Sequence, residues 1–223
     1  MKKLVYAFGE GKADGSAALR DLLGGKGAGL AEMSRIGVPV PPGFTLTTEV
    51  CRGYWQQQGK GLAERGKARS LSMNGKGVMG VPGLKAQFDR ALEQLEARMG
   101  RRLGDPAAPL LVSVRSGAKF SMPGMMDTVL NLGLTQACVE AMVRDDSRAR
   151  FVLDSRRRFI QMFGNVVKGI EKEAFEEILH EQKRAAGKKS DGELGQGDLR
   201  AVSDRYLDLY RRRTGEVFPD DAR

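Results

Sequence analysis

The sequence predicts an α+β fold, in which a part with both strands and helices is followed by a part made of helices. Two observations lead to this prediction. Short apolar segments of strand composition occur only before residue 135. After Thr135, apolar residues recur at the three- and four-residue spacing of amphipathic helices. We therefore predict an α/β part over 1–134 and a helical part over 135–223.

The first part is predicted to alternate strands and helices. Gly37 is expected to end the first helix, and the proline-rich segment 38–43 to be extended. The basic, glycine-rich stretch 59–83 has little periodicity and predicts a surface loop or insertion. Leu110–Val114 is the most apolar strand candidate, so we expect a central strand there. The predicted elements are a strand over 3–8, a helix over 28–36, a strand over 44–47, a helix with Thr48 as its N-cap, a helix over 84–99, a strand over 110–114 and a strand over 128–132.

The second part carries no strand pattern. Four amphipathic segments predict helices over 135–144, 148–168, 171–186 and 198–213. The polar, glycine-containing segment 187–197 is predicted to link the last two helices.

The chain is basic, with a formal net charge of +9 and a pI near 9.7. This charge invites a nucleic-acid interpretation. Aromatic residues are only 6% of the chain and do not alternate with the basic ones, as a stacking platform would require. A polyanionic small ligand, or an acidic surface elsewhere in the protein, accounts for the charge equally well. We therefore predict no nucleic-acid partner, and a nucleic-acid binder would instead show a steep loss of affinity with salt.

The composition also bears on location. No apolar run approaches the roughly 20 residues needed to cross a bilayer, and the apolar run at the start ends at Phe8, which is too short for a signal peptide. The two cysteines, Cys51 and Cys138, lack metal-ligand spacing. The sequence thus predicts a cytoplasmic protein without a membrane segment.

The segment Gly24-Gly25-Lys26-Gly27 is the first candidate binding site. Backbone N–H groups at a helix start attract anions, and a lysine adds a mobile charge. The segment is not a P-loop, because Arg20 stands where the first glycine belongs and Gly27 replaces the Ser or Thr after the lysine. Considered alone, it is equally a glycine turn with a solvated lysine.

Arg115 is the second candidate. It ends the apolar strand 110–114 and precedes Ser116-Gly117, the place where α/β proteins bind ligands. A guanidinium buried there requires an anion or a carboxylate, so a phosphate site and a structural ion pair are both open. The loop Ser121–Asp127, with three methionines around Pro-Gly, could line a nucleotide pocket, act as a lid or pack under the helical part.

The third candidate is the arginine run Arg156–Arg158. Successive helical residues point about 100° apart, so the three cannot share one face. Arg158 is predicted to turn inward toward a cleft, because it neighbours an apolar stripe through Phe151, Phe159 and Met162. The other two arginines are predicted to be solvated or paired with Asp154 and nearby acids. His180 is expected on a helix surface, and no metal-ligand constellation is evident.

Four segments together resemble the pyruvate phosphate dikinase family. They are LLGGKGAGLAEM (22–33), GVPVPPGFTLTTE (37–49), PLLVSVRSGAKFSMPGMMDTVLNLGL (109–134) and DSRRRFIQMFGNVV (154–167). The third segment is the most specific, because the related phosphoenolpyruvate synthases carry a different loop after the V-R-S core.

The resemblance implies part of an ATP-grasp-type nucleotide-binding domain with a helical subdomain. The family converts ATP, phosphate and pyruvate to AMP, pyrophosphate and phosphoenolpyruvate, with Mg²⁺, through a phosphohistidine on a separate domain. It implies that Lys26 and Arg115 contact phosphate and that Arg158 supports ATP binding and the first phosphoryl transfer. Gly24, Gly25 and Gly27 are then backbone contacts to phosphate.

The resemblance also implies partners beyond these 223 residues. The Mg²⁺ ligands, the phosphohistidine domain and the pyruvate-binding barrel are expected outside them, so the chain alone is expected to be inactive. A homodimer through those other domains is compatible with the family. The alternatives are a fragment of a phosphoenolpyruvate synthase and a non-catalytic module that binds a nucleotide or a partner protein.

Overall fold

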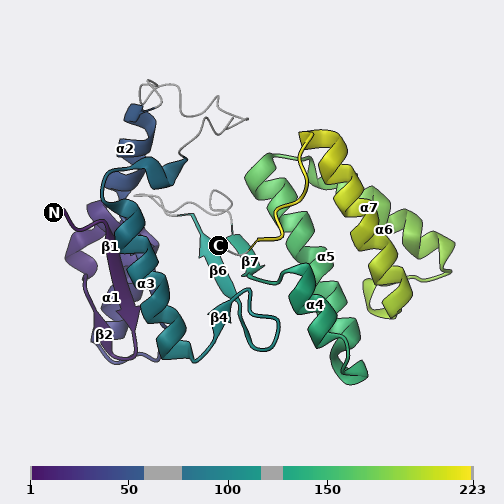
Figure 1. The fold of residues 1–223 in the computed structure, drawn as a ribbon, viewed down its shortest axis with the longest axis horizontal. Helices are drawn as coiled ribbons and strands as arrows, with labels where there is room; N and C mark the ends of the chain where they lie inside the picture. The colour runs from purple at the N-terminus through teal and green to yellow at the C-terminus, as the bar shows by residue number, and fades with distance from the viewer. Residues whose placement is uncertain (1, 58–76, 117–127, 222–223) are drawn as a thin grey trace. The chain divides into compact units, whose positions relative to one another are not determined.

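The computed structural model describes residues 2–57, 77–116 and 128–221 (Figure 1). The predicted loop 59–83 therefore lies largely outside the described residues, and the methionine loop 121–127 lies wholly outside them. The described parts contain helices and small sheets, so the α+β prediction is confirmed.

The packing forms two units, and the division differs from the boundary expected at residue 134. The first unit contains the described residues up to Gly100 and also Ser116, and the second contains Arg101–Arg115 together with the described residues from Thr128 onward. The strand Thr128–Leu132 packs on the long helix Asp146–Lys168, and this contact groups the last strands with the helices. Strand composition alone does not show which neighbour a strand packs against.

The first unit is built on a three-stranded antiparallel sheet. Its central strand, β1 (Val5–Gly9), pairs with β2 (Lys12–Ala13) on one side and β3 (Gly43–Leu46) on the other. The register sets Tyr6 opposite Thr45 and Ala7 opposite Phe44. Because side chains alternate across a strand, these two pairs face opposite sides of the sheet.

Two long helices cover the two faces of this sheet. A Cβ on Gly27 of α1 (Arg20–Arg35) would lie 2.7 Å from Cγ2 of Thr45, so α1 packs on the Thr45 face. The ring of Phe88 on α3 (Leu84–Met99) meets Phe44 edge-on at 5.5 Å, so α3 packs on the other face. The remaining elements of this unit are η1 (Ala17–Leu19), α2 (Thr48–Gln57) and η3 (Val78–Gly80).

The helices of the first unit are joined by side-chain hydrogen bonds. The Thr48 hydroxyl, predicted as a cap, donates to the Asp21 carbonyl at 2.9 Å and so joins the start of α2 to the start of α1. The Leu4 amide donates to Oε1 of Gln87 on α3 at 2.8 Å. Buried apolar residues from strand, loop and helix complete this small core, among them Val5, Val50 and Leu84.

The second unit begins with two strand pairs. β4 (Arg102–Leu103) runs parallel to β5 (Pro109–Leu110), and β6 (Val112–Arg115) runs antiparallel to β7 (Thr128–Leu132). The β6–β7 register shifts between Val112 and Val114, and Asn131 takes the left-handed φ of 58° that asparagine tolerates.

The predicted central position of the strand 110–114 is wrong for the part of the chain described here. Leu111 is 37% exposed and Val114 is 49% exposed. The reason is that β6 pairs with β7 alone among the described strands, and helix α5 packs on β7. Apolar composition indicates what a strand can bury, whereas its neighbours decide whether it is buried.

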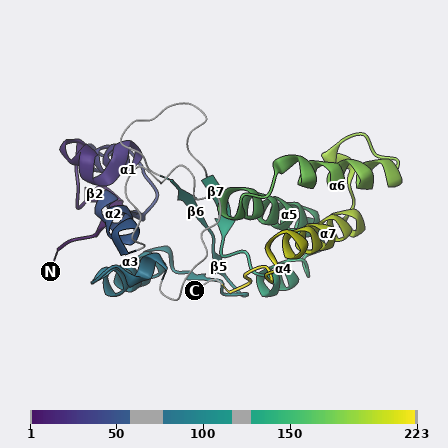
Figure 2. The same cartoon turned by 90° about the horizontal axis from the view of Figure 1, so that it is seen from above.

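The helical part agrees with the prediction. The helices are α4 (Gln136–Met142), α5 (Asp146–Lys168), α6 (Lys172–Ala185) and α7 (Gln196–Thr214), with the short η4 (Asp191–Glu193) between the last two. Figures 1 and 2 both show α5 lying beside α7. None of the described helices is long and apolar enough to cross a membrane.

The core of the second unit is rich in aromatic rings. Phe175 of α6 and Tyr206 of α7 are fully buried and meet edge-on at 4.9 Å. Phe218 follows α7 and packs against Phe159 and Phe163 of α5, which brings the segment after α7 onto α5. Burying one such side chain contributes roughly 1.5–3 kcal/mol, so this cluster fixes the face that α5 turns inward.

Candidate functional site

The glycine segment of α1 contains a helix start, as predicted, although α1 as a whole begins at Arg20, about one turn before Gly24. Gly24 has φ 71° and ψ 168°, which interrupts the helix between Arg20 and Arg35. Only glycine takes up this backbone conformation without strain. A new helical segment therefore begins at Gly25-Lys26-Gly27, where the first N–H groups lack helical acceptors.

Lys26 lies in this new first turn and is partly exposed. No hydrogen bond or ion pair of its ammonium occurs among the described residues. The close approach of Gly27 to Thr45 fixes the helix start on the sheet. The amides of a helix start, its positive end and an ammonium without an ion pair in the described part of the chain together favour a bound anion.

Arg115 is the last residue of β6 and lies opposite Thr128. Its side chain is exposed, so the expectation of a buried guanidinium is wrong. No ion pair of Arg115 occurs among the described residues, so the structural-ion-pair alternative finds no support in them. A guanidinium without a carboxylate at a strand end remains available to a phosphate.

The prediction for the arginine run is wrong in its orientation. Arg156 is 4% exposed and Arg157 is 2% exposed, whereas the Arg158 side chain is 59% exposed. The buried stripe of α5 runs through Ala149, Val152, Leu153, Arg156, Arg157, Ile160 and Gly164. Arg156 and Arg157 follow Val152 and Leu153 by four residues and so share their face. Phe151, 71% exposed, precedes Arg158 by seven residues and shares the outer face instead.

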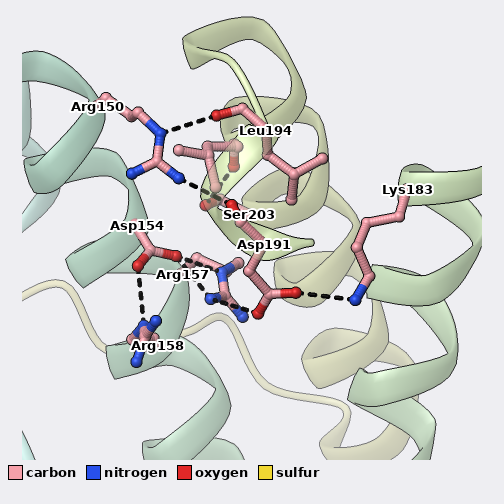
Figure 3. A network of polar contacts seen from close by, with 9 residues as sticks. Arg150, Asp154, Arg157, Arg158, Lys183, Asp191, Leu194 and Ser203 are labelled. Atoms are coloured by element: carbon pink, nitrogen blue, oxygen red, sulfur yellow. Dashed lines mark hydrogen bonds and ion pairs between the residues drawn. The ribbon is translucent and has the colours of Figure 1, made fainter. Parts of the chain in front are cut away.

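Arg157 and Arg158 bind the same carboxylate (Figure 3). Asp154 accepts two hydrogen bonds from Arg157 through Oδ1, at 2.9 and 2.6 Å, and one from Nε of Arg158 through Oδ2, at 2.9 Å. The predicted pairing of Arg157 with Asp154 is thus confirmed. Because the Arg157 side chain is buried, this ion pair belongs to the interior of the helical unit.

A second carboxylate completes this network. Asp191 of η4 lies 3.6 Å from Nη2 of Arg157 and accepts a hydrogen bond from Nζ of Lys183 at 2.9 Å. Burial acts to raise the pKa of Asp191, but the Lys183 and Arg157 cations outweigh it and the pKa is lowered. Burial acts to lower the pKa of Arg157, but Asp154 outweighs it and the pKa is raised. Both groups are therefore held charged.

Arg156 has a separate structural role that the sequence did not reveal. Its Nη1 donates to the Leu134 carbonyl at 2.6 Å, and its Nη2 donates to Asp220 at 2.7 Å. Asp220 also accepts from the Gln136 amide, at the start of α4. Arg156 lines a cavity of about 130 Å³ together with Leu132, Phe163 and Asp220. It joins the segment after α7 to the interior and is not placed as a ligand contact.

Carboxylates for a divalent cation are not grouped in the described part of the chain. No cluster of three His, Cys, Asp or Glu side chains occurs there. The two carboxylates of the network around Arg157, Asp154 and Asp191, are both paired with cationic side chains and do not fit Mg²⁺ as they stand. His180 is exposed on α6, as predicted.

The three predicted phosphate contacts are distributed over both units. Lys26 and the glycines belong to the first unit, and Arg115 and Arg158 belong to the second. Among the described residues, each unit by itself contains a cation that no carboxylate, or only one, engages. Convergence of the three on one ligand stays a prediction.

Comparison with known proteins gives consistent matches. Residues 20–149 match the family described as "Pyruvate phosphate dikinase, AMP/ATP-binding domain". The chain is 46% identical over 221 residues to "Pyruvate, phosphate dikinase" of Rhizobium meliloti (strain 1021), covering 99% of this chain and 22% of that protein. It is 46% identical over 222 residues to "Pyruvate, phosphate dikinase, chloroplastic" of Flaveria trinervia, covering 100% of this chain and 21% of that protein. It is 48% identical over 222 residues to "Pyruvate, phosphate dikinase 1, chloroplastic" of Oryza sativa subsp. japonica, again covering 100% and 21%. The chain spans about a fifth of the length of these relatives.

Proposed function

Because this chain belongs to the pyruvate phosphate dikinase family, in its AMP/ATP-binding domain, we propose that it binds the polyphosphate of ATP through Lys26, Arg115 and Arg158. The backbone at Gly24, Gly25 and Gly27 supplies further contacts to phosphate. The observation that carries this proposal is the state of the three cations. Among the described residues, Lys26 and Arg115 have no ion pair, and Arg158 commits only its Nε.

The proposed chemistry depends on positioning and charge. A phosphoryl group in transfer carries negative charge on its outer oxygens, and fixed cations and amides stabilise that charge. Lys26 contributes a compact ammonium at a helix start, whereas the two arginines contribute planar forks that match phosphate oxygens. Together they hold the polyphosphate in one orientation.

In the whole protein, we propose that the bound ATP phosphorylates a histidine on another domain. The proposed overall reaction is ATP + phosphate + pyruvate to AMP + pyrophosphate + phosphoenolpyruvate. The relatives' name, pyruvate, phosphate dikinase, and the match to the AMP/ATP-binding domain family support its pyruvate, phosphate and nucleotide components. Mg²⁺, when bound, neutralises phosphate charge, and its ligands are proposed to come from the remainder of the protein. The two units are then parts of one ATP-grasp-type domain. A phosphoenolpyruvate synthase is not favoured, because the relatives named above are dikinases.

The test is ATP binding by the 223-residue chain and its variants, measured by calorimetry or NMR titration. A hydrogen bond to a charged group contributes roughly 1.5–3 kcal/mol. Lys26→Ala and Arg115→Ala should therefore each weaken ATP binding by about 10-fold or more. Lys172→Ala and Arg211→Ala change exposed cations on α6 and α7 and serve as matched controls. Unchanged ATP affinity in both site variants would contradict the proposal.

A further inference from the structure

Arg158 is held along one edge of its guanidinium only. Nε donates to Oδ2 of Asp154 at 2.9 Å, and the side chain is 59% exposed. The two terminal nitrogens have no partner among the described residues. The contact therefore fixes the inner edge of the group and leaves the outer edge, which matches a phosphate, open.

Asp154 cannot easily turn away from Arg158. Its side chain is 17% exposed, and its other oxygen accepts two hydrogen bonds from Arg157, whose side chain is 3% exposed. Each oxygen of the carboxylate thus has a separate arginine. A carboxylate held in this way offers Arg158 a fixed acceptor.

The support extends from α5 to α6 and η4. Arg157 reaches Asp191, and Asp191 accepts from Lys183. Arg150 donates to the backbone carbonyls of Asp191 and Leu194, at 2.8 and 3.0 Å, and so ties the segment between α6 and α7 to α5 (Figure 3). The carboxylate behind Arg158 is therefore fixed by three elements of the unit.

The ion-paired side chains of this network carry more positive than negative charge. Arg157, Arg158 and Lys183 carry three positive charges, and Asp154 and Asp191 carry two negative ones, a difference of +1. Arg150, which donates to backbone carbonyls, adds a further positive charge. Arg157 and Lys183 are largely buried. Of the three ion-paired cations, Arg158 is the one exposed to solvent.

We propose that Asp154 is a positioning residue for Arg158. It holds Nε so that the two terminal nitrogens are presented to a phosphate of ATP before the nucleotide arrives. This inference rests on the proposed function, in which Arg158 contacts the polyphosphate. An arginine that is ordered beforehand loses less side-chain freedom on binding, which increases affinity.

The test compares Asp154→Asn, Arg158→Ala and the double variant in ATP titrations of the 223-residue chain. Asp154→Asn should weaken ATP binding by about 3- to 10-fold. In the double variant, ATP binding should be no weaker than in Arg158→Ala, because the aspartate acts only through the arginine. Asp89→Asn removes a matched i,i+4 pair with Lys85 on α3 and should leave the affinity unchanged. Wild-type or tighter affinity in Asp154→Asn, or losses that add in the double variant, would overturn the inference.

A second variant avoids the buried partner of Asp154 altogether. Arg158→Lys keeps the charge at an exposed position, but an ammonium next to Asp154 cannot present a free fork to phosphate. It should weaken ATP binding nearly as much as Arg158→Ala, and a lysine variant with wild-type affinity would overturn the inference. If Arg158→Ala itself binds ATP as wild type does, the role of Arg158 in the proposed function fails as well. A loss in Arg158→Ala without one in Asp154→Asn overturns the positioning role alone.

Discussion

The glycine segment of α1 and the arginine run of α5 present cations in different ways. In α1, one backbone conformation at Gly24 creates the helix start, and Lys26 follows without an ion pair among the described residues. In the arginine run of α5, Arg156 and Arg157 are buried in structural contacts, and Arg158 is the one of the three that is exposed. The first site depends on the backbone and the second depends on a charge network. Substitutions in α1 should therefore act through backbone strain, and substitutions in α5 through the loss of ion pairs.

The largest effect is expected within the arginine run itself. Arg157→Ala removes a guanidinium that is 3% exposed from two carboxylates, and breaking such a buried pair costs about 3–5 kcal/mol. Arg158→Ala removes an exposed i,i+4 pair and should cost less than about 0.5 kcal/mol. Urea unfolding of both variants measures the difference in the free energy of unfolding. Equal losses would show that the two arginines do not differ in role.

The next effect concerns the backbone of α1. Gly24→Ala forces a side chain into a conformation that only glycine adopts freely, which should cost about 1–3 kcal/mol in the free energy of unfolding. Gly29→Ala is the matched control, because a Cβ there meets nothing within 4 Å. Removing a helical glycine at that position should stabilise the chain by about 0.5–1 kcal/mol. Thermal unfolding should show a lower Tm than wild type for Gly24→Ala and a higher Tm for Gly29→Ala. A shift of both Tm values in the same direction would contradict this account.

A smaller loss is expected where the segment after α7 returns to α5. Asp220→Asn weakens the contact to Arg156 and the acceptor for the Gln136 amide. Because Asp220 is 38% exposed, we expect about 1–2 kcal/mol. Asp208→Asn, at an exposed position of α7, should change the free energy of unfolding by less than about 0.5 kcal/mol. Equal unfolding midpoints for the two variants would show that the contacts of Asp220 do not contribute to stability.

The smallest effect is a pH dependence that belongs to the second unit. The pKa of Asp191 is lowered from 3.8 in the folded chain, so the unfolded chain binds the proton more readily. Its contribution to stability is present above the ordinary pKa and is lost as the pH falls through the folded value. Asp191→Asn should therefore be less stable than wild type at pH 7, and the two should converge as the pH falls through the lowered pKa of Asp191 in the folded chain. A stability difference that persists unchanged in acid would contradict this assignment.

The sequence predicted the features that depend on local pattern. The four helices of the second unit follow from their apolar spacing, and the helix start at Gly24–Gly27 follows from its glycines. The orientation of α5 was also encoded, because Arg156 and Arg157 stand four residues after Val152 and Leu153 on the buried stripe. The prediction instead followed a stripe through Phe151, Phe159 and Met162. Phe159 is buried but Phe151 is 71% exposed, so the prediction turned the wrong arginine inward.

Other features depend on residues far apart in the sequence. Asp220 reaches Arg156 across 64 positions, and Arg150 reaches Asp191 across 41. No periodic pattern contains such pairs. The exposure of β6 likewise depends on which elements pack against it, so its apolar composition was a poor guide to its place in the fold.

The central proposal is that Lys26, Arg115 and Arg158 bind the polyphosphate of one ATP molecule. An ¹H–¹⁵N NMR titration of the 223-residue chain with ATP tests it directly, since it follows the backbone amides of Gly25–Gly27 and the Nε–H of Arg158 together. The account predicts that both sets of signals shift along one saturation curve with a single Kd. Shifts confined to one unit, or two curves with different Kd values, would contradict it.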